Sequence, residues 1–224
     1  MLDSDYGEFS AVYRLRETLS TTRLATPPRS RPVRPMMERG ASVAGQAVVL
    51  VGLMGAGKSS VGRRLAKHLK LDFVDADEEI VKAAGCSIED IFELYGEDAF
   101  RDVERRVIAR LLKNGANVLA VGGGAFMSPE IRTEILERCV SVWLRAELDV
   151  LVRRTARRGG RPLLKGGDPR EILQDMMDER YPVYAEADIV VDTNDEPPEV
   201  TVEKIIGALE SGRDAAGSTG DPGP

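Results

Sequence analysis

The sequence has very few of the residues on which metal-centre and disulfide chemistry depend. Its 224 residues contain two cysteines, Cys86 and Cys139, and one histidine, His68. The cysteines lie far apart without Cys-x-x-Cys or Cys/His spacing, so neither a zinc site nor a disulfide framework is predicted. His68 is expected to be a surface helix residue rather than a catalytic base. Catalytic chemistry must then depend on carboxylates, arginines, a lysine and a metal ion.

Two further absences concern the partners of the protein. No apolar run reaches the roughly 18 residues that a membrane span needs, and the acidic start MLDSDYGEFS does not resemble a secretory signal. The formal net charge is −6 and the isoelectric point is near 5.1. Binding to a nucleic-acid backbone requires clustered excess Lys and Arg. We therefore expect a cytoplasmic protein that binds neither membrane nor nucleic acid.

The two ends of the chain do not have the apolar periodicity of folded segments. Residues 1–44 are rich in arginine and proline and are predicted to be disordered. Two alternatives for this segment are an arm that binds an acidic partner and a translation start at Met36 or Met37. The Gly, Ser and Pro content of residues 211–224 predicts a second disordered tail. Residues 45–210 remain as one catalytic domain.

Within residues 45–210, short apolar runs alternate with helical patterns, which is typical of a parallel sheet with crossover helices. The apolar runs are rich in valine and leucine without polar alternation, which predicts strands buried on both faces. Strands are expected at 47–51, 73–74, 117–121, 140–144 and 189–191. Helices are expected at 58–70, 78–84, 88–113, 129–137, 147–157, 169–180 and 199–210. The predicted fold class is α/β, with three α/β/α layers around a mostly five-stranded parallel sheet.

A glycine-rich motif lies where the first strand is expected to lead into a helix. Residues 52–59, GLMGAGKS, fit G-x-x-x-x-G-K-[ST] in the strand-to-helix context that a P-loop requires. Glycines allow successive N–H groups to turn toward phosphate oxygens, and the helix N-terminus adds a positive dipole end. Lys58 is expected to reach the β- and γ-phosphates, and the Ser59 hydroxyl to ligate Mg²⁺. The motif predicts a bound nucleoside triphosphate without identifying the phosphoryl acceptor.

Residues that follow the second and third strands are candidates for the acceptor site, because ligands of open α/β sheets bind beyond the carboxyl ends of the strands. In extended geometry, Asp75 and Asp77 would turn to one side, to hold Mg²⁺ and to accept the proton of the attacking hydroxyl. The alternative for this pair is a helix N-cap followed by a solvated acid. Gly122–Gly124 leave main-chain N–H groups uncovered for a small polar ligand, unless they form a plain flexible turn.

Two arginines could offer guanidinium forks to a carboxylate on the acceptor. Arg101 lies on a predicted helix, where its alternative is an exposed position with i,i+4 pairs. Arg180 is expected at a helix end before Pro182, where its alternative is pairing with the helix dipole. The two side chains together therefore predict an anionic acceptor, although neither is distinctive alone.

Residues 153–167 form the densest basic stretch of the predicted domain, with glycine pairs on both sides of an Arg-Pro-Leu-Leu core. This pattern predicts a mobile lid over about residues 155–168. From such a lid, Arg161 could offset the charge on the transferring phosphoryl group. A solvated basic loop is the alternative.

The motifs taken in order resemble the shikimate kinase family over roughly residues 47–210: GLMGAGKSSVGRRLA, DAD, GEDAFRDVE, GGGA, RRT followed by RPLL, and ERYPVY. The resemblance implies a P-loop NTPase fold of the nucleoside-monophosphate-kinase type, with ATP and Mg²⁺ as requirements. It implies phosphorylation of the 3-hydroxyl of shikimate in chorismate and aromatic amino-acid biosynthesis. A monomer is expected.

The resemblance also implies roles for individual residues. Asp77 would contact the shikimate hydroxyls and act as the base, and Arg101 and Arg180 would pair with the shikimate carboxylate. The remaining substrate contacts implied are Gly122, Gly123 and Gly124. The nucleotide contacts implied are Gly55, Ala56, Gly57, Lys58, Ser59, Ser60, Arg154 and Arg161, with Lys58 and Arg161 catalytic and Arg154 beside the adenine. The metal site implied is Ser59, with Asp75 acting through water.

Smaller features of the resemblance concern the pocket walls and two departures from the family pattern. Phe92 and Phe100 match apolar walls of the acceptor pocket, although both could be ordinary core residues. Ser60 stands where Thr is common, and Ala76 where Thr or Ser is usual. Neither departure removes a functional group to which a role is assigned.

Two other functions are compatible with a P-loop. A relative that acts on gluconate, another small polyol or a nucleotide would keep the P-loop and lid without needing two arginines beside Asp77. A non-catalytic ATP-binding module would be expected to have lost a catalytic element. This sequence retains Lys58, Ser59, Asp77 and Arg161, which favours the kinase.

Overall fold

The computed structural model describes residues 46–115, 117–157 and 167–217. Five parallel strands form one sheet in the order β2-β3-β1-β4-β5. Their bounds are β1 Val48–Val51, β2 Asp72–Asp75, β3 Asn117–Ala120, β4 Val140–Arg145 and β5 Ile189–Asp192. Because every connection between these strands carries at least one helix, the expected crossover pattern and the five-stranded parallel sheet are confirmed.

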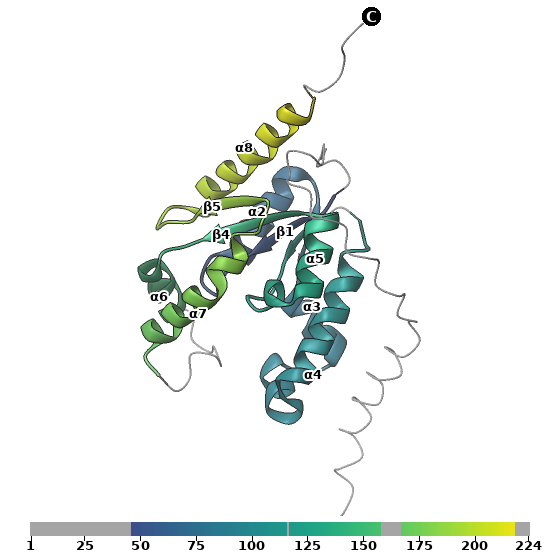
Figure 1. The fold of residues 1–224 in the computed structure, drawn as a ribbon, viewed down its shortest axis with the longest axis vertical. Helices are drawn as coiled ribbons and strands as arrows, with labels where there is room; N and C mark the ends of the chain where they lie inside the picture. Colours follow the sequence, from purple (N-terminus) through teal and green to yellow (C-terminus); the bar gives the residue numbers. More distant parts are fainter. Residues whose placement is uncertain (1–45, 116, 158–166, 218–224) are drawn as a thin grey trace, which may run out of the picture.

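Helices cover both faces of the sheet (Figure 1). Their bounds are α2 Lys58–Leu69, α3 Ala76–Ala84, α4 Ile88–Leu111, the 3-10 turn η2 Ala125–Met127, α5 Pro129–Arg138, α6 Leu148–Ala156, α7 Pro169–Tyr184 and α8 Pro198–Gly217. Helices α2 and α8 pack on each other and on the sheet, while α5 contacts β4 and α7 contacts η2 on the other side. The fold is therefore the predicted three-layer α/β/α arrangement.

The central strands and the edge strands differ in burial. Strands β1 and β3 are buried at every position, as their apolar runs predict. The edge strand β5 instead alternates buried and exposed side chains, and Val190 is 43% exposed. The edge strand β2 has no fully buried residue. Burial on both faces was therefore a wrong prediction for these two edge strands.

Most helix boundaries differ from the sequence-based expectations by one or two residues, and three of the differences are informative. Helix α3 begins at Ala76 rather than residue 78, because the Asp75 side chain caps its N-terminus. Helix α7 continues through Pro182 to Tyr184 rather than ending at 180. Helix α8 continues to Gly217 rather than ending at 210. Extending a helix that has already formed costs little per residue, which explains this last difference.

Helix α4 is bent at Gly96, although a continuous helix was expected over 88–113. Gly96 has φ 81° and ψ 175°, a conformation that glycine adopts without steric cost. The first part of the helix begins at Ser87, whose side chain forms a reciprocal capping box with Asp90. The bend sets the direction of the second part of α4, which carries Arg101 and Glu104.

The structure also places the two cysteines and the histidine. Cys86 and Cys139 are both free, and His68 is an exposed residue of α2. Over the described part of the chain, no helix has both the length and the apolar character needed to cross a bilayer. The predicted disorder of residues 1–44 and 218–224, Arg161 and most of the predicted lid lie outside the described residues.

Candidate active site

The loop between β1 and α2 has a backbone that only glycine accommodates at several positions. Gly52, Gly55 and Gly57 have φ values of 144°, 83° and 98°. A Cβ added at Gly52 would lie 2.7 Å from the Leu144 carbonyl oxygen, and one at Gly55 would lie 3.1 Å from Thr155 Cγ2. The loop therefore packs closely against the end of β4 and against α6, which holds its backbone in one shape.

Lys58 and Ser59 open helix α2 directly after this loop. The Lys58 ammonium donates hydrogen bonds to the carbonyl oxygens of Gly52 at 2.8 Å and Leu53 at 3.2 Å, so it lies over the loop. The Ser59 hydroxyl donates to Asp75 Oδ2 at 2.7 Å. A cation and a hydroxyl paired with a carboxylate thus lie at the helix N-terminus, where anions are stabilised.

Ser59 and Asp75 are the oxygen-bearing pair that could hold a metal ion. Among the described residues there is no group of three or more His, Cys, Asp and Glu side chains arranged to bind a metal. A hydroxyl and one carboxylate nevertheless suit Mg²⁺, which keeps several waters and takes its other ligands from substrate phosphates. The 2.7 Å approach of the Ser59 hydroxyl to Asp75 Oδ2 brings both oxygens to one place. These residues therefore fit a phosphate-bound Mg²⁺.

The sequence suggested that Asp75 and Asp77 lie together in extended backbone at the end of β2. The structure shows a different arrangement. Asp75 is the N-cap of α3, and its Oδ1 accepts a hydrogen bond from the Asp77 backbone N–H at 3.1 Å. Asp77 lies in the first turn of the helix, so the two side chains are directed by different backbone conformations. The N-cap alternative was correct for Asp75. Asp77 is exposed, and its Oδ1 would lie 3.1 Å from a Cβ added at Gly122.

The glycine segment Gly122–Gly124 follows β3 and is the point at which the predicted acceptor residues meet. A Cβ added at Gly123 would lie 3.6 Å from Arg180 Nη1 and 3.5 Å from the Gly52 carbonyl oxygen of the P-loop. At Gly124 an added Cβ would lie only 2.5 Å from Arg101 Nη1. The structure therefore brings Asp77, Arg101 and Arg180 from α3, α4 and α7 to one segment, beside the P-loop.

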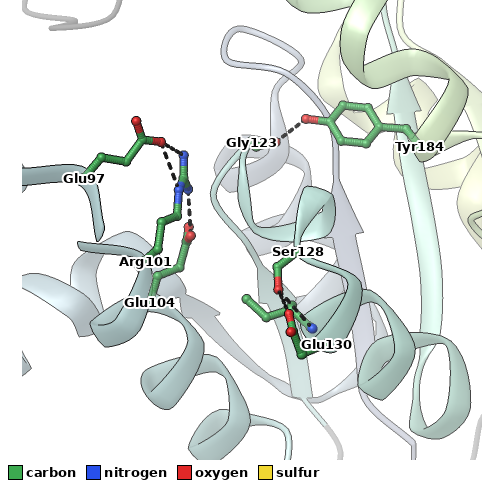
Figure 2. A network of polar contacts seen from close by, with 8 residues as sticks. Glu97, Arg101, Glu104, Gly123, Ser128, Glu130 and Tyr184 are labelled. Carbon is green, nitrogen blue, oxygen red and sulfur yellow. Dashed lines mark hydrogen bonds and ion pairs between the residues drawn. The ribbon is translucent and has the colours of Figure 1, made fainter. Parts of the chain in front are cut away.

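Arg101 is held against the glycine segment by two glutamates of its own helix (Figure 2). Its Nη1 donates to Glu104 Oε2 at 2.7 Å, and its Nη2 donates to Glu97 Oε1 at 3.0 Å. Glu104 is 1% exposed, whereas the Glu97 side chain is 63% exposed. The alternative interpretation, an exposed helix residue with i,i+4 pairs, describes the contact with Glu97 alone. The contact with Glu104 is different, because that carboxylate is buried.

Glu104 is a site residue that the sequence analysis did not single out. Burial raises the pKa of its carboxyl, the ion pair with Arg101 opposes this, and the nearby charge of Asp77 raises it further. A Cβ added at Gly122 would lie 3.0 Å from Glu104 Oε1 and 3.1 Å from Asp77 Oδ1. Two carboxylates therefore flank Gly122. The i,i+3 spacing to Arg101 within GEDAFRDVE was the signal that could have identified Glu104.

Arg180 is a largely buried cation beside Gly123. Its side chain is 14% exposed. It forms an ion pair with Glu179, in which Nε lies 3.7 Å from the carboxylate oxygen Oε2. Nε is buried and has no hydrogen-bond partner among the described residues. The predicted position at a helix end was wrong because α7 continues to Tyr184. Pairing with the helix terminus therefore does not account for this arginine, and a buried unsatisfied donor favours an anionic ligand.

The remaining predicted nucleotide residues surround the P-loop. The Arg154 guanidinium donates to the carbonyl oxygens of Gly55 at 3.4 Å and of Asn194, which lies between β5 and α8. Burial lowers the pKa of Arg154. Ala56 is 1% exposed, and the Ser60 hydroxyl accepts a hydrogen bond from Arg64 at 3.1 Å. Arg154 therefore joins the P-loop to the segment between β5 and α8, and its contact with the nucleotide stays a prediction.

Two phenylalanines lie near Arg101 as the resemblance implied. The Phe92 and Phe100 rings have centroids 4.7 Å apart, and the Arg101 guanidinium lies 5.2 Å from the Phe100 ring centroid. Phe100 is buried and Phe92 is half-buried. Both therefore join the core to the Arg101 side of the site, and their role as pocket walls stays a prediction.

Comparisons with known proteins agree with the motif order. The family model for shikimate kinase matches residues 54–210. A shikimate kinase of Paramagnetospirillum magneticum is 58% identical over 165 residues, which cover 74% of this chain and 85% of that protein. One from Caulobacter vibrioides is 57% identical over 162 residues, which cover 72% of this chain and 81% of that protein.

Solved structures give the same result. The structure of shikimate kinase from Acinetobacter baumannii in complex with shikimate superposes with a TM-score of 0.72 at 38% identity, over 74% of this chain and 93% of that one. Shikimate kinase from Aquifex aeolicus superposes with a TM-score of 0.63 at 33% identity, over 74% of this chain and 97% of that one. The described site residues all fall within or next to the matched segment 54–210.

Proposed function

The chain belongs to the shikimate kinase family and is an ATP-dependent phosphotransferase, and from this premise we propose how its residues transfer the γ-phosphoryl group to shikimate. The acceptor atom is the 3-hydroxyl, and the products are shikimate 3-phosphate and ADP. The observation that carries this proposal is the meeting of Asp77, Arg101 and Arg180 at Gly122–Gly124, next to the P-loop. A base and two guanidinium groups suit a small polyol that has a carboxylate.

The nucleotide is held by the P-loop and the start of α2. Backbone N–H groups of Gly55 and Gly57 would face the β-phosphate, with the hydroxyls of Ser59 and Ser60 at the helix N-terminus. The Ala56 N–H donates to the Leu53 carbonyl oxygen at 3.1 Å and would have to release it to join them. Lys58 exchanges its carbonyl partners for the β- and γ-phosphates when ATP binds. Arg154 contacts the adenine end. We extend the proposal to Arg161 on the basis of the motif order alone.

The residues that would hold Mg²⁺ are Ser59, through its hydroxyl, and Asp75, through water. The hydrogen bond of 2.7 Å between these two side chains supports the assignment, because one ion can replace the shared proton contact. When bound, Mg²⁺ offsets the negative charge of the phosphates. Asp75 also caps α3, so it connects the metal site to the helix that carries Asp77.

Shikimate lies against the glycine segment, with its carboxylate between Arg101 and Arg180. The buried Nε of Arg180 gains a partner there, and Arg101 can release its exposed contact with Glu97 while keeping Glu104. Asp77 accepts the proton of the 3-hydroxyl as that oxygen attacks the γ-phosphorus. Main-chain N–H groups of Gly122–Gly124 contact the remaining oxygens of the ring.

We also propose that residues 45–210 are the catalytic domain of a monomer that acts in the cytoplasm, where ATP is available. The family match over residues 54–210 supports this boundary. Size-exclusion chromatography with light scattering would test the monomer, with a mass near 24.4 kDa expected.

A phosphorylation assay with an acceptor panel tests the proposed substrate. Purified protein with Mg²⁺-ATP is given shikimate, gluconate and nucleoside monophosphates in parallel, and ADP release is followed. We expect turnover with shikimate alone. Turnover with gluconate at a comparable kcat/KM would favour the alternative polyol kinase, and turnover with none of the panel would contradict the proposed transfer.

Replacing either substrate arginine with alanine is expected to weaken shikimate binding specifically. Each variant deletes charge-assisted hydrogen bonds worth about 1.5–3 kcal/mol, which corresponds to a rise in KM for shikimate of about 10- to 100-fold. Arg180→Ala should have the larger effect, because Arg180 is the more buried of the two. The KM for ATP should stay within about twofold. If only the KM for ATP rose, the assignment of both arginines would be wrong.

Glu104→Gln tests the buried partner of Arg101. The substitution keeps the shape but removes the charge that holds the guanidinium at Gly124, so we expect KM for shikimate to rise about tenfold. The matched control is Glu97→Gln, which removes the exposed partner of the same arginine and should change KM by less than about twofold. Equal effects of the two substitutions would contradict a special role for the buried carboxylate.

A further inference from the structure

Tyr184 ends helix α7 with its side chain in the core and its hydroxyl at the glycine segment. The residue is fully buried, and its ring packs edge-on against Phe126 and Trp143, with centroids 6.3 Å and 6.0 Å away. The hydroxyl donates a short hydrogen bond to the Gly123 carbonyl oxygen (Figure 2). A rigid aromatic ring thus carries one polar atom to the backbone of the acceptor site.

The same hydroxyl also contacts Arg180, which lies one helical turn earlier on α7. The guanidinium charge acts on the Tyr184 hydroxyl and lowers its pKa, and arginine has donors only to offer to that oxygen. Both atoms lie at Gly123: an added Cβ there would be 3.6 Å from Arg180 Nη1 and 3.7 Å from the Tyr184 hydroxyl oxygen. One hydroxyl therefore donates to the substrate backbone and lies beside the substrate arginine.

The protonation state of the hydroxyl maintains its bond to Gly123. Burial raises the pKa of Tyr184 to about 12, against the opposing effect of the Arg180 charge. The hydroxyl therefore keeps its proton throughout the physiological range and remains a donor to Gly123. Tyr184 itself contacts neither the substrate nor the reacting atoms in this arrangement.

We propose that Tyr184 is a positioning residue for the acceptor, which fixes the Gly123 peptide and the Arg180 guanidinium relative to each other. The inference rests on the proposed function, because it presupposes that Gly123 and Arg180 bind shikimate. A glycine peptide rotates easily, and an arginine side chain has several rotatable bonds, so both lose freedom when a ligand binds. A hydroxyl that holds both in place before binding removes part of that cost.

Tyr181 provides a matched control from the same helix. Its ring also packs edge-on against Trp143, with centroids 4.9 Å apart, and its hydroxyl also donates to a backbone carbonyl oxygen. That carbonyl belongs to Ala146, between β4 and α6, and not to the glycine segment. Tyr181→Phe and Tyr184→Phe therefore each remove one hydroxyl from the same aromatic cluster, and only the second touches the acceptor site.

Steady-state kinetics of the two Phe variants test the inference. We expect Tyr184→Phe to raise KM for shikimate about tenfold, the effect of one lost hydrogen bond. The KM for ATP should stay within twofold, and Tyr181→Phe should leave both KM values within twofold. KM does not depend on the amount of folded enzyme, so partial unfolding of either variant does not obscure the comparison. An unchanged KM for shikimate in Tyr184→Phe, or an equal rise in Tyr181→Phe, would overturn the inference.

Two additional measurements separate this inference from the proposed function. In a double-mutant cycle, Tyr184→Phe should add less than its single effect once Arg180 is alanine, whereas additive effects would contradict positioning of Arg180. Titration of the emission of Trp143, the only tryptophan, gives shikimate affinity without turnover. If Arg180→Ala weakens shikimate binding and Tyr184→Phe does not, only the inference fails. If Arg180→Ala leaves shikimate affinity unchanged, the proposed function itself fails.

Discussion

Asp77→Asn is expected to lower kcat for shikimate phosphorylation by about 10²- to 10⁴-fold, the usual contribution of a positioned general base. Asparagine has the same shape but cannot accept the proton of the attacking hydroxyl. The N-cap contact of α3 should survive, because it uses the backbone N–H of residue 77 and not its side chain. The KM for ATP should therefore stay within about twofold, and the melting temperature should change little.

The control for this variant is Asp72→Asn, at the opposite end of β2. Asp72 is exposed and lies at the start of the strand, away from the glycine segment, so its substitution should leave kcat unchanged. Rates are measured by coupled ADP release at saturating shikimate and ATP. Turnover of Asp77→Asn at the level of Asp72→Asn would remove Asp77 from the mechanism. Glu104, the other carboxylate at Gly122, would then be the next candidate for the base.

The parts of the site that the sequence predicted well are those set by local backbone chemistry. The P-loop glycines are needed for positive φ values within a few residues of each other, so the motif and its strand-to-helix context identify the loop directly. At Gly124 the constraint is weaker, because an added Cβ would lie 2.5 Å from the Arg101 guanidinium, the end of a flexible side chain that would have to shift. Such constraints are visible in the identity of single residues.

The parts that the sequence did not predict depend on contacts between distant segments. Glu104 resembles any acidic residue of an amphipathic helix until the fold buries it beside Gly122. Tyr184 and Gly123 are 61 residues apart, and nothing in either local pattern indicates that they are hydrogen-bonded. Asp77 was misplaced for a related reason, because the alternation of a strand was assumed to continue past Asp75, where the cap already begins α3.

Pro182 illustrates how tertiary packing overrides a local signal. A proline removes one backbone donor and usually ends a helix, which is why α7 was expected to end near Arg180. In the structure the helix continues for two residues, and the rings on either side of Pro182, Tyr181 and Tyr184, pack on Trp143. Burial of two aromatic rings is worth several kcal/mol, more than one lost hydrogen bond, so the helix persists.

Lys58→Ala is expected to slow phosphoryl transfer strongly without unfolding the protein. The ammonium is the charge placed to act on the transferring phosphate, and loss of one such group typically costs about 10²- to 10³-fold in kcat. Without nucleotide, the same ammonium makes two hydrogen bonds to the Gly52 and Leu53 carbonyl oxygens. Their loss should cost about 1–3 kcal/mol of stability, or a fall of roughly 2–10 °C in melting temperature.

Lys67→Ala is the matched control, because Lys67 is an exposed lysine on the same helix α2, far from its N-terminus. It should retain full activity and melt close to the unmodified protein. Turnover and thermal melting are measured on both variants, and addition of Mg²⁺-ATP should raise the melting temperature of Lys67→Ala more than that of Lys58→Ala. Gross unfolding of Lys58→Ala would contradict the prediction. The bonds of Lys58 to Gly52 and Leu53, and not its charge on the phosphates, would then explain the lost activity.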